Sequence, residues 1–578
     1  MKKMYRRVLS LFLAGSLLLG GCGLPGHDSA SVSARFDAYT DQLFREEIVL
    51  NTINLHYTLA HPENYGITEY TPSLGDYNPD SVEESYQSLE EMKKDLTSFR
   101  RSALTDSQKL TYDILMDYVK TELLAKDLSL YSEVLGPTTG YQAQLPVLLA
   151  EYTFRTRQDI EDYLALLSQV DVIFQGIVSF EQKKSQAGLF MSDLVADTII
   201  DQCQEFIKDP DNNYMIEVFN DKLSTFEGLT HQEKNDYMEQ NRTLVTTEVV
   251  GAYQSLIDGL TNLKGTGHND LGLCYYEKGK EYYEYLVRSG TGSDTPVKKL
   301  QEETLDFIND GLEQIYDAVT ANPDLAEQIY EYRFALTDPQ DIMEDLINKV
   351  SADFPEMEKV NYTIKYVHPS MQEHMSPAFY LTPPVDDTEN NVIYINQKYM
   401  DDDIYPTIAH EGYPGHLYQT VYTSSCKLPL VRNMLSYSGY TEGWATYVEY
   451  YSYGISGLDP QLADLIAVNA AMTLGLYAYI DMGIHYDGWE LSDVMDFLEQ
   501  FGISDEEAAK EIFETMVAEP ANYLNYFIGY LEFLNLRAQA QKELGGRFDL
   551  KEFHRFLLEI GPAPFYIIED YMEDWMKE

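Results

Sequence analysis

Residues 406–419 read PTIAHEGYPGHLYQ, and this stretch decides how the chain folds around its most distinctive side chains. His410 and His416 are six residues apart, so on a regular helix they would point roughly 120° away from each other. Pro414 has no N–H for the carbonyl of His410, and the two glycines of the stretch permit unusual dihedral angles. The sequence therefore predicts a bulge or break in the helix, with two looped-out residues that return His416 to the face of His410.

A candidate zinc site follows from the same stretch. Two imidazoles and one carboxylate are a usual ligand set for catalytic zinc, because they leave one position open for water. His410 and His416 supply the imidazoles, and Glu442 in TEGW (441–444) follows 26 residues after His416. Glu411 can take a proton from the water, as the glutamate of an HExxH helix does. We expect one zinc ion per chain, with Glu411 as general base.

A second carboxylate lies on the same predicted helix as Glu442. Glu442 and Glu449 are seven residues apart, so they fall on nearly one helical face. One can bind the metal while the other orients a ligand histidine from behind, and we assign these roles to Glu442 and Glu449 in that order. The alternative is a solvated acidic helix face, since glutamate side chains are seldom buried.

Hydrolysis of a carbonyl compound also needs a hydrogen-bond donor for the oxyanion. Tyr526 and Tyr530 lie four residues apart on one helix face, and His485 is a third candidate donor. The alternative for each is a packing role. The chain contains 47 tyrosines, and a lone histidine in a helical protein is usually a satisfied core residue.

Two further residues are candidates for substrate binding. Arg537, in an otherwise apolar and aromatic helix, could pair with a substrate carboxylate, although an ion pair with one of the many acids is the favoured alternative. Asn396, on a predicted strand before the site, could bond a substrate backbone or could be a turn residue. His554 is interpreted as structural.

The composition excludes several classes of protein. Hydrophobic residues make up 44% of the 578 residues, which excludes intrinsic disorder. Lys and Arg number 41 against 95 Asp and Glu, a formal charge of −54 without a basic stripe, so nucleic acid is excluded as a partner. The four cysteines are too few and too widely spaced for a disulfide framework: Cys22, Cys203, Cys274 and Cys426.

Helical patterns dominate the chain, and we predict a mainly α, two-lobed fold. Capping signals stand at 105–108 (TDSQ), 459–460 (DP) and 504–507 (SDEE). Three short β patterns, at 361–367, 378–381 and 391–397, predict a small sheet directly before the metal site. We expect an N-terminal helical lobe at 35–295 and a catalytic helical lobe at 296–578, which includes the sheet at 361–397.

The N-terminus predicts export and a lipid anchor. A basic start and an apolar run at 8–19 indicate a signal peptide over 1–21. The end of this segment, Leu-Gly-Gly-Cys, resembles a bacterial lipoprotein signal, which is cut before a lipidated cysteine, here Cys22. The alternative is an ordinary secretory signal. Residues 22–34 are expected to form a tether to the extracytoplasmic face of the cell membrane. The signal carries four basic and no acidic residues, so the mature charge is −58.

Five motifs together resemble the bacterial family catalogued as domain of unknown function 885: AHEGYPGH (409–416), TEGWATYVE (441–449), IDMGIHYDGW (480–489), NYFIGYLEFLNLR (525–537) and RFDLKEFHRFLLEIGPAPF (547–565). The resemblance extends from about residue 35 to the C-terminus. Members are regarded as zinc metallopeptidases, related in fold to mainly helical oligopeptidases and carboxypeptidases. The resemblance implies zinc at His410, His416 and Glu442, with Glu411 as general base.

Two positions depart from the pattern of that family. Leu417 stands where a second histidine usually follows, and Pro-Ala-Asn at 520–522 stands where Pro-Gly-Gln is usual. Neither position is a proposed ligand or base.

Three hypotheses about function remain open at this stage. The leading one is a lipid-anchored, extracytoplasmic zinc peptidase, a hydrolase that acts on short peptides. The second is a non-catalytic lipoprotein that binds peptides or metal, and the third is a zinc hydrolase of another amide or ester. Glu411 favours catalysis, because a purely structural site needs ligands but no adjacent base.

Overall fold

The computed structural model describes residues 29–367, 369, 372, 376–400 and 404–577. The signal peptide predicted for 1–21 and the lipidation predicted at Cys22 lie outside these described residues. Within them the protein is mainly α-helical with one small β-sheet, which confirms the predicted fold class.

The first half of the chain contains twelve α-helices: α1 (Ser29–Ile48), α2 (Thr52–Thr58), α3 (Pro79–Thr97), α4 (Asp106–Glu122), α5 (Tyr141–Glu151), α6 (Arg157–Leu167), α7 (Val170–Gln186), α8 (Asp193–Ile207), α9 (Tyr214–Thr225), α10 (His231–Leu244), α11 (Val250–Leu263) and α12 (Gly279–Thr291).

The second half contains the strands and the remaining helices: α13 (Val297–Ala321), α14 (Leu325–Glu331), α15 (Pro339–Val350), β1 (Tyr362–Tyr366), β2 (Ala378–Leu381), β3 (Asn391–Ile395), α16 (Tyr405–Glu411), α17 (His416–Ser425), α18 (Ser438–Ile455), α19 (Pro460–Met482), α20 (Leu491–Glu499), α21 (Glu506–Ala518), α22 (Asn522–Leu544), α23 (Leu550–Ile560) and α24 (Phe565–Trp575). Short 3-10 and π segments join them, among them η8 (Leu430–Met434) and η9 (Gly483–Asp487).

Local capping explains where several helices begin. Thr105 caps α4 with the predicted capping box, and the Asp459 carboxylate accepts from two backbone N–H groups at the start of α19. The cap predicted at Ser504 is wrong by one residue. Asp505 is the cap of α21 because its carboxylate reaches two N–H groups of the first turn.

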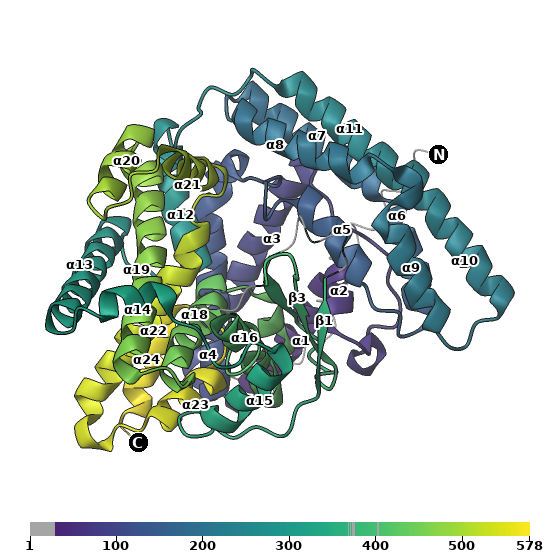
Figure 1. The fold of residues 1–578 in the computed structure, drawn as a ribbon. Coiled ribbons are helices and arrows are strands. Elements are labelled where there is room, and N and C mark those ends of the chain that lie inside the picture. Colours follow the sequence, from purple (N-terminus) through teal and green to yellow (C-terminus); the bar gives the residue numbers. More distant parts are fainter. Residues whose placement is uncertain (1–28, 368, 370–371, 373–375, 401–403, 578) are drawn as a thin grey trace.

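The hydrophobic cores do not follow the predicted boundary at 295/296. One cluster lies wholly within residues 53–260 and is formed mainly by α5 to α11, the upper right part of Figure 1. By contrast, the cluster around α1 and α4 includes Val431 of η8, and the cluster around α12 includes residues of α19 and α22. The first half of the chain therefore contributes to both parts of the molecule.

The small sheet lies between these two parts. Its strand order is β1-β3-β2, with β1 parallel and β2 antiparallel to β3. Ile393 and Ile395 belong to the core that contains α16 and α18, whereas Tyr394 packs with Ala150 of α5. The Tyr394 hydroxyl also donates to the carboxylate of Glu151 at 2.6 Å. The sheet thus joins α5 to the helices that follow it in the chain.

One long apolar helix among the described residues is a core helix. α19 and η9 together form Pro460–Asp487, which is long and apolar enough to cross a membrane, yet 56% of its most apolar window is buried inside the protein. Its buried residues pack in clusters shared with α22 and α21. The helix is apolar because it packs against other helices inside the protein.

The predicted tether extends too far into the chain. α1 begins at Ser29, inside residues 22–34, because Val32 is only 6% exposed and packs in the same cluster as Phe36. The three described cysteines are free thiols: Cys203, Cys274 and Cys426.

Ala521 provides a test of backbone strain. It precedes α22 with φ 64° and ψ 5°, a left-handed conformation that costs a residue with a Cβ about 1 kcal/mol relative to glycine. We predict that Ala521→Gly raises the free energy of unfolding by about 1 kcal/mol in urea titrations. The matched control is Ala538→Gly, exposed in the interior of the same helix, which should lower it by about 1 kcal/mol. If both variants lose stability, the claim that the backbone of Ala521 is strained is wrong.

Candidate metal centre

The helix breaks where predicted. α16 ends at Glu411 and α17 begins at His416, and the Gly415 N–H still reaches the carbonyl of Ala409 at 2.9 Å. Gly415 is required by this close approach, because a Cβ there would lie 1.8 Å from the His410 carbonyl oxygen. The indole N–H of Trp444 donates to the carbonyl of Pro414 at 2.9 Å inside the core. The break is therefore a fixed part of the structure.

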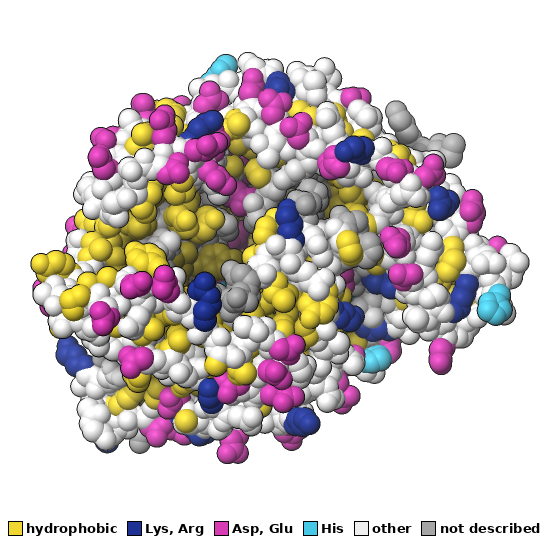
Figure 2. All heavy atoms as spheres, in the orientation of Figure 1, with side chains coloured by type: hydrophobic (Ala, Val, Ile, Leu, Met, Phe, Trp, Pro, Cys, Tyr) yellow, Lys and Arg dark blue, Asp and Glu magenta, His cyan; other side chains and the backbone are white. Residues whose placement is uncertain are grey.

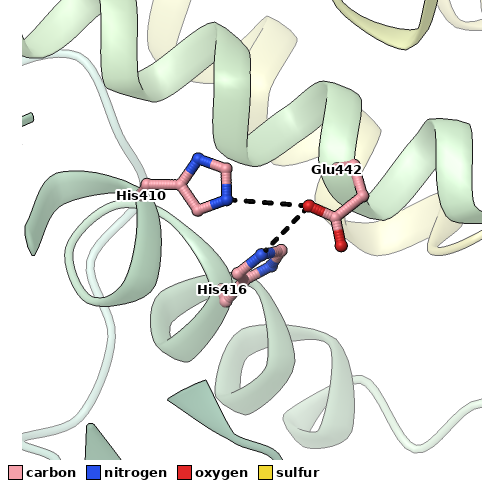
Figure 3. Close-up of side chains that lie close together, drawn as sticks. All are labelled: His410, His416 and Glu442. Atoms are coloured by element: carbon pink, nitrogen blue, oxygen red, sulfur yellow. Dashed lines mark ion pairs between the residues drawn. The ribbon is translucent and has the colours of Figure 1, made fainter. Parts of the chain in front are cut away.

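This break brings His410 and His416 together with Glu442 of α18 (Figure 3). The Nε2 atoms of the two histidines lie 3.6 Å and 3.5 Å from the same carboxylate oxygen, Oε2 of Glu442. A tetrahedral zinc ion with ligand bonds of about 2.0–2.1 Å separates its ligand atoms by about 3.4 Å. The three side chains therefore fit one metal ion, and the chemistry of two imidazoles and a carboxylate suits zinc.

The electrostatics of the three groups are strongly coupled. Burial raises the pKa of Glu442, but its hydrogen bonds with His410 and His416 outweigh burial and hold the pKa below its usual value. Burial lowers the pKa of His410, yet the carboxylates of Glu442 and Glu449 raise it above its usual value. The carboxylates thus favour positive charge at the point where the imidazoles converge.

Glu449 lies behind His410. Its Oε2 is 2.9 Å from Nδ1 of His410, on the side of the ring opposite the Nε2 that faces Glu442. A proton on Nδ1 then leaves Nε2 as the atom with a lone pair for a metal. Glu442 and Glu449 do share one face of α18, as their spacing indicates.

Glu411 is held by the edge strand of the sheet. The backbone N–H of Tyr380 in β2 donates to Glu411 Oε2 at 2.8 Å, and Glu411 is only 8% exposed. The carboxylate therefore has a fixed orientation next to His410, the candidate metal ligand that precedes it in the chain.

The structure separates the two candidate tyrosines. Burial, followed by the charges of Glu442 and Glu411, raises the pKa of Tyr526, so this hydroxyl stays protonated. Among the described residues its hydroxyl has no hydrogen-bond partner. Tyr530 instead packs edge to face on Tyr450, with ring centres 5.1 Å apart, as a residue of the core.

The prediction of His485 as an oxyanion donor is not supported by its position. His485 is buried, its Nδ1 accepts from the N–H of Leu273 at 3.1 Å, and its Nε2 donates to the carbonyl of Met516 at 2.8 Å. Both nitrogens are engaged within the core, so no proton is available for a substrate. His485 is a structural residue, which is the alternative that its sequence context left open.

Arg537 and Asn396 also have internal partners. Arg537 donates to the Tyr447 hydroxyl at 3.0 Å, and that hydroxyl lies 2.9 Å from His554, so Arg537 belongs to a side-chain network. It forms no ion pair with an acid among the described residues. Asn396 is fully buried, and its amide donates to the carbonyl of Gln372 at 2.8 Å. This buried position does not support the substrate-binding role predicted for Asn396. It favours the alternative, in which Asn396 is a turn residue.

Two groups that build the site were not foreseen. Trp444 lies in the TEGW motif, and a tryptophan two residues after a ligand is a visible signal for a buried support. The Tyr380 N–H is a backbone group, for which the sequence carries no signal.

A hollow opens at the middle of the molecular face shown in Figure 2, between hydrophobic surface on one wall and acidic side chains above it. In the same view, helices that include α19 and α22 lie on one side of it and the small sheet on the other.

The model of the family described as bacterial protein of unknown function (DUF885) matches residues 63–572. The chain belongs to the DUF885 family. Among curated proteins no relative matches it.

Solved structures share the fold of this DUF885 member. A putative lipoprotein from Colwellia psychrerythraea aligns with a TM-score of 0.81 at 19% identity, over 95% of this chain and 99% of that one. A putative lipoprotein of unknown function from Shewanella oneidensis aligns with a TM-score of 0.65 at 15% identity, over 93% and 99% of the two chains. A putative oligoendopeptidase F from Bacillus anthracis covers 88% and 97% at 12% identity, but its TM-score of 0.31 carries no conclusion.

Two of the buried histidines, His485 and His554, predict a dependence of stability on pH. Burial lowers the pKa of His485 and of His554 from 6.5 to about 4. The contribution of these neutral histidines to the free energy of unfolding is complete above pH 6.5. It is lost as pH falls toward 4, because only the unfolded chain takes up protons at these two positions in that window. Each histidine then contributes about 3 kcal/mol to the loss.

We predict that His554→Gln flattens the decline of the unfolding free energy between pH 6.5 and 4.5, measured by urea titration at each pH. The variant is less stable at pH 7, so the informative quantity is the slope with pH. Parallel slopes for wild type and variant would show that His554 does not stay neutral in the fold.

Proposed function

We propose that this DUF885 protein is a zinc-dependent peptidase that hydrolyses short peptides outside the cytoplasm. The observation that carries the proposal is the convergence of His410 and His416 on one oxygen of Glu442 at separations suited to zinc. Glu411 adds a base next to a ligand, which a purely structural metal site does not need.

Each residue of the centre then has a role in hydrolysis. When bound, zinc lowers the pKa of a water toward ~7 and polarises the scissile carbonyl. Glu411 accepts the proton of the attacking water and passes it to the leaving amine. The Tyr380 N–H holds Oε2 of Glu411, so Oε1 is the oxygen we assign to proton transfer.

Tyr526 is the donor that we assign to the oxyanion. Burial and the charges of Glu442 and Glu411 raise the pKa of its hydroxyl, which therefore keeps the proton that an oxyanion donor requires. Tyr530 and His485 have packing roles instead, so α22 contributes one catalytic hydroxyl.

The position of β2 favours a peptide over another amide or ester. β2 is an edge strand, and it lies beside α16, where it contacts Glu411. The free edge of a sheet binds an extended peptide through main-chain hydrogen bonds. A peptide aligned with β2 would pass directly over the metal ligands.

We place the protein at the cell membrane, anchored through Cys22. The similar structures from Colwellia and Shewanella are described as putative lipoproteins, which supports this assignment. α1 begins at Ser29, seven residues after Cys22, so the connection spans at most about 25 Å when fully extended. The catalytic body then stays close to the lipid surface.

The metal assignment predicts one zinc ion per chain in the purified protein, measured by elemental analysis. His416→Ala removes a ligand and should lose the metal, whereas Glu411→Gln should retain it and lose at least about 10²-fold in kcat on a peptide library. Full zinc in His416→Ala contradicts the ligand set. If the wild-type protein binds zinc but hydrolyses no peptide, the remaining hypothesis is a non-catalytic lipoprotein that binds metal.

The tyrosine assignment predicts a difference between two neighbouring variants. Tyr526→Phe should lower kcat by about 10²-fold with little change in KM, because the hydroxyl acts on charge that develops in the transition state. Tyr530→Phe, one turn further along α22, is the matched control and should stay within a few-fold of wild type. Equal losses in both variants would assign the effect to helix packing.

A further inference from the structure

The carboxylate of Glu519 connects two parts of the molecule that are far apart in the sequence. Glu519 directly follows α21 and is only 8% exposed. Its Oε1 accepts hydrogen bonds from the backbone N–H groups of Thr138 at 2.6 Å and Thr139 at 3.1 Å, in the loop before α5. Its Oε2 accepts from the side-chain amide of Asn522, the first residue of α22, at 3.5 Å. One buried carboxylate thus links the loop before α5 to the start of α22.

The loop at 136–140 (GPTTG) has a fixed shape that presents these two N–H groups to Glu519. The carbonyls of residues 136, 137 and 138 each accept a hydrogen bond from a glutamine side chain of α5 or α8, at 2.6, 2.8 and 2.9 Å: Gln142, Gln202 and Gln144, in that order. Gly140 lets the loop close on itself, because a Cβ there would lie 2.0 Å from the backbone nitrogen of Gly136. The loop is therefore a fixed extension of the part of the molecule that α5 to α11 form.

α5 connects this loop to the sheet that holds Glu411. The helix begins directly after the loop, and Glu151 at its other end accepts from the Tyr394 hydroxyl of β3 at 2.6 Å. β3 pairs with β2, and the Tyr380 N–H of β2 donates to Glu411. α5 has 11 residues, so its two ends lie about 16 Å apart. One short helix is therefore bound at one end to the sheet beside the proposed base and at the other, through the loop, to the helix of the proposed oxyanion donor.

Tyr526 lies close to the end of α22 that these contacts fix. It is the fifth residue of the helix, about 6 Å along the axis from Asn522. A second carboxylate holds the residue before the helix, because the Ala521 N–H donates to Asp481 of α19 at 3.0 Å. The start of α22 is therefore bound to α19 through Asp481 and to the loop before α5 through Glu519.

We propose that Glu519 is a positioning residue for the hydrolysis of peptides. It binds the start of α22 to the loop before α5, so that the helix of Tyr526 and the sheet that holds Glu411 belong to one connected framework. The inference rests on the proposed function, in which Tyr526 donates to the oxyanion and Glu411 is the base. Such groups must stay within about 0.5 Å of their productive positions, and hydrogen bonds to a carboxylate are stronger than those between neutral groups. Glu519 acts through Tyr526 and does not itself touch the substrate.

The first test measures the hydrogen bonds of Glu519 and needs no activity. Amide hydrogen exchange at Thr138 and Thr139 is compared between the wild-type protein and Glu519→Ala. Both threonines are exposed, so the bonds to Glu519 are what protects their amides. We expect exchange at these two amides to be at least about tenfold faster in the variant. Equal rates in the two proteins overturn the link between the loop and α22.

The second test measures kcat and KM on a hydrolysed peptide, with the zinc content and the melting temperature of each variant measured alongside. Glu519→Ala should lower kcat about tenfold and change KM less than about twofold, because a displaced donor acts on the transition state. Glu519→Gln keeps an acceptor oxygen without the charge and should lose only about two- to threefold in kcat. Glu511→Ala, at an exposed position of α21, is the matched control and should equal the wild type. A higher KM with unchanged kcat in the Glu519 variants overturns the positioning role.

A double-mutant cycle separates positioning of Tyr526 from a general effect on the fold. In the Tyr526→Phe background, Glu519→Ala should change kcat by less than about twofold, because the hydroxyl that Glu519 positions is already gone. The same tenfold loss in both backgrounds overturns the proposal and assigns Glu519 to the stability of the fold.

The outcomes distinguish this proposal from the proposed function on which it rests. A wild-type protein that hydrolyses no peptide overturns the proposed function, and the role of Tyr526 falls with it. Slow exchange at Thr138 and Thr139 in the same sample would then show that the link itself exists. Peptide hydrolysis that the Glu519 variants leave unchanged overturns the positioning role alone.

Discussion

The hydrogen bond from the Trp444 indole to the carbonyl of Pro414 connects the broken helix to α18. His410 and His416 reach the centre from either side of the break, and Glu442 reaches it from α18. Tetrahedral coordination tolerates displacements of only a few tenths of an ångström, so the three backbones need a common reference point. A buried bond from a fully buried tryptophan provides that point, since neither end can exchange its partner for water.

The small sheet extends the same constraint to the base. Tyr380 presents its N–H to Glu411 only because β2 pairs in register with β3, and β3 is fixed by packing on both faces. One face joins the core around α16, and the other joins α5 through Tyr394. A change in the position of α5 relative to the second half of the chain would therefore act on Glu411 through the sheet.

The convergence of His410, His416 and Glu442 was predictable because its signals are local. The spacing of His410 and His416, with Pro414 between them, requires a break in the helix, and the break is where the spacing places it. The helical class and the three strands follow from hydrophobic patterns that each segment carries by itself. Local signals also placed the caps to within one residue.

The remaining errors concern long-range contacts. His485 and Asn396 have the residue types of catalytic and binding groups, but their partners, Met516 and Gln372, lie in segments that no local pattern relates to them. The hydrophobic cores cross the predicted boundary at 295/296 for the same reason, because α12 packs on helices more than 150 residues further along the chain. The spacing of residues along the chain predicts which of them share a helix face. Whether that face is buried, and against which partner, depends on the whole fold.

The balance of charge shows why the centre suits a divalent cation. Glu411, Glu442 and Glu449 share one region, and no lysine or arginine among the described residues forms an ion pair with them. Their repulsion favours a proton on His410, as the raised pKa of that imidazole indicates. A divalent cation supplies the same positive charge at the convergence of the two Nε2 atoms. A histidine must be neutral to bind a metal. Metal binding at this centre is therefore linked to the release of a proton from His410.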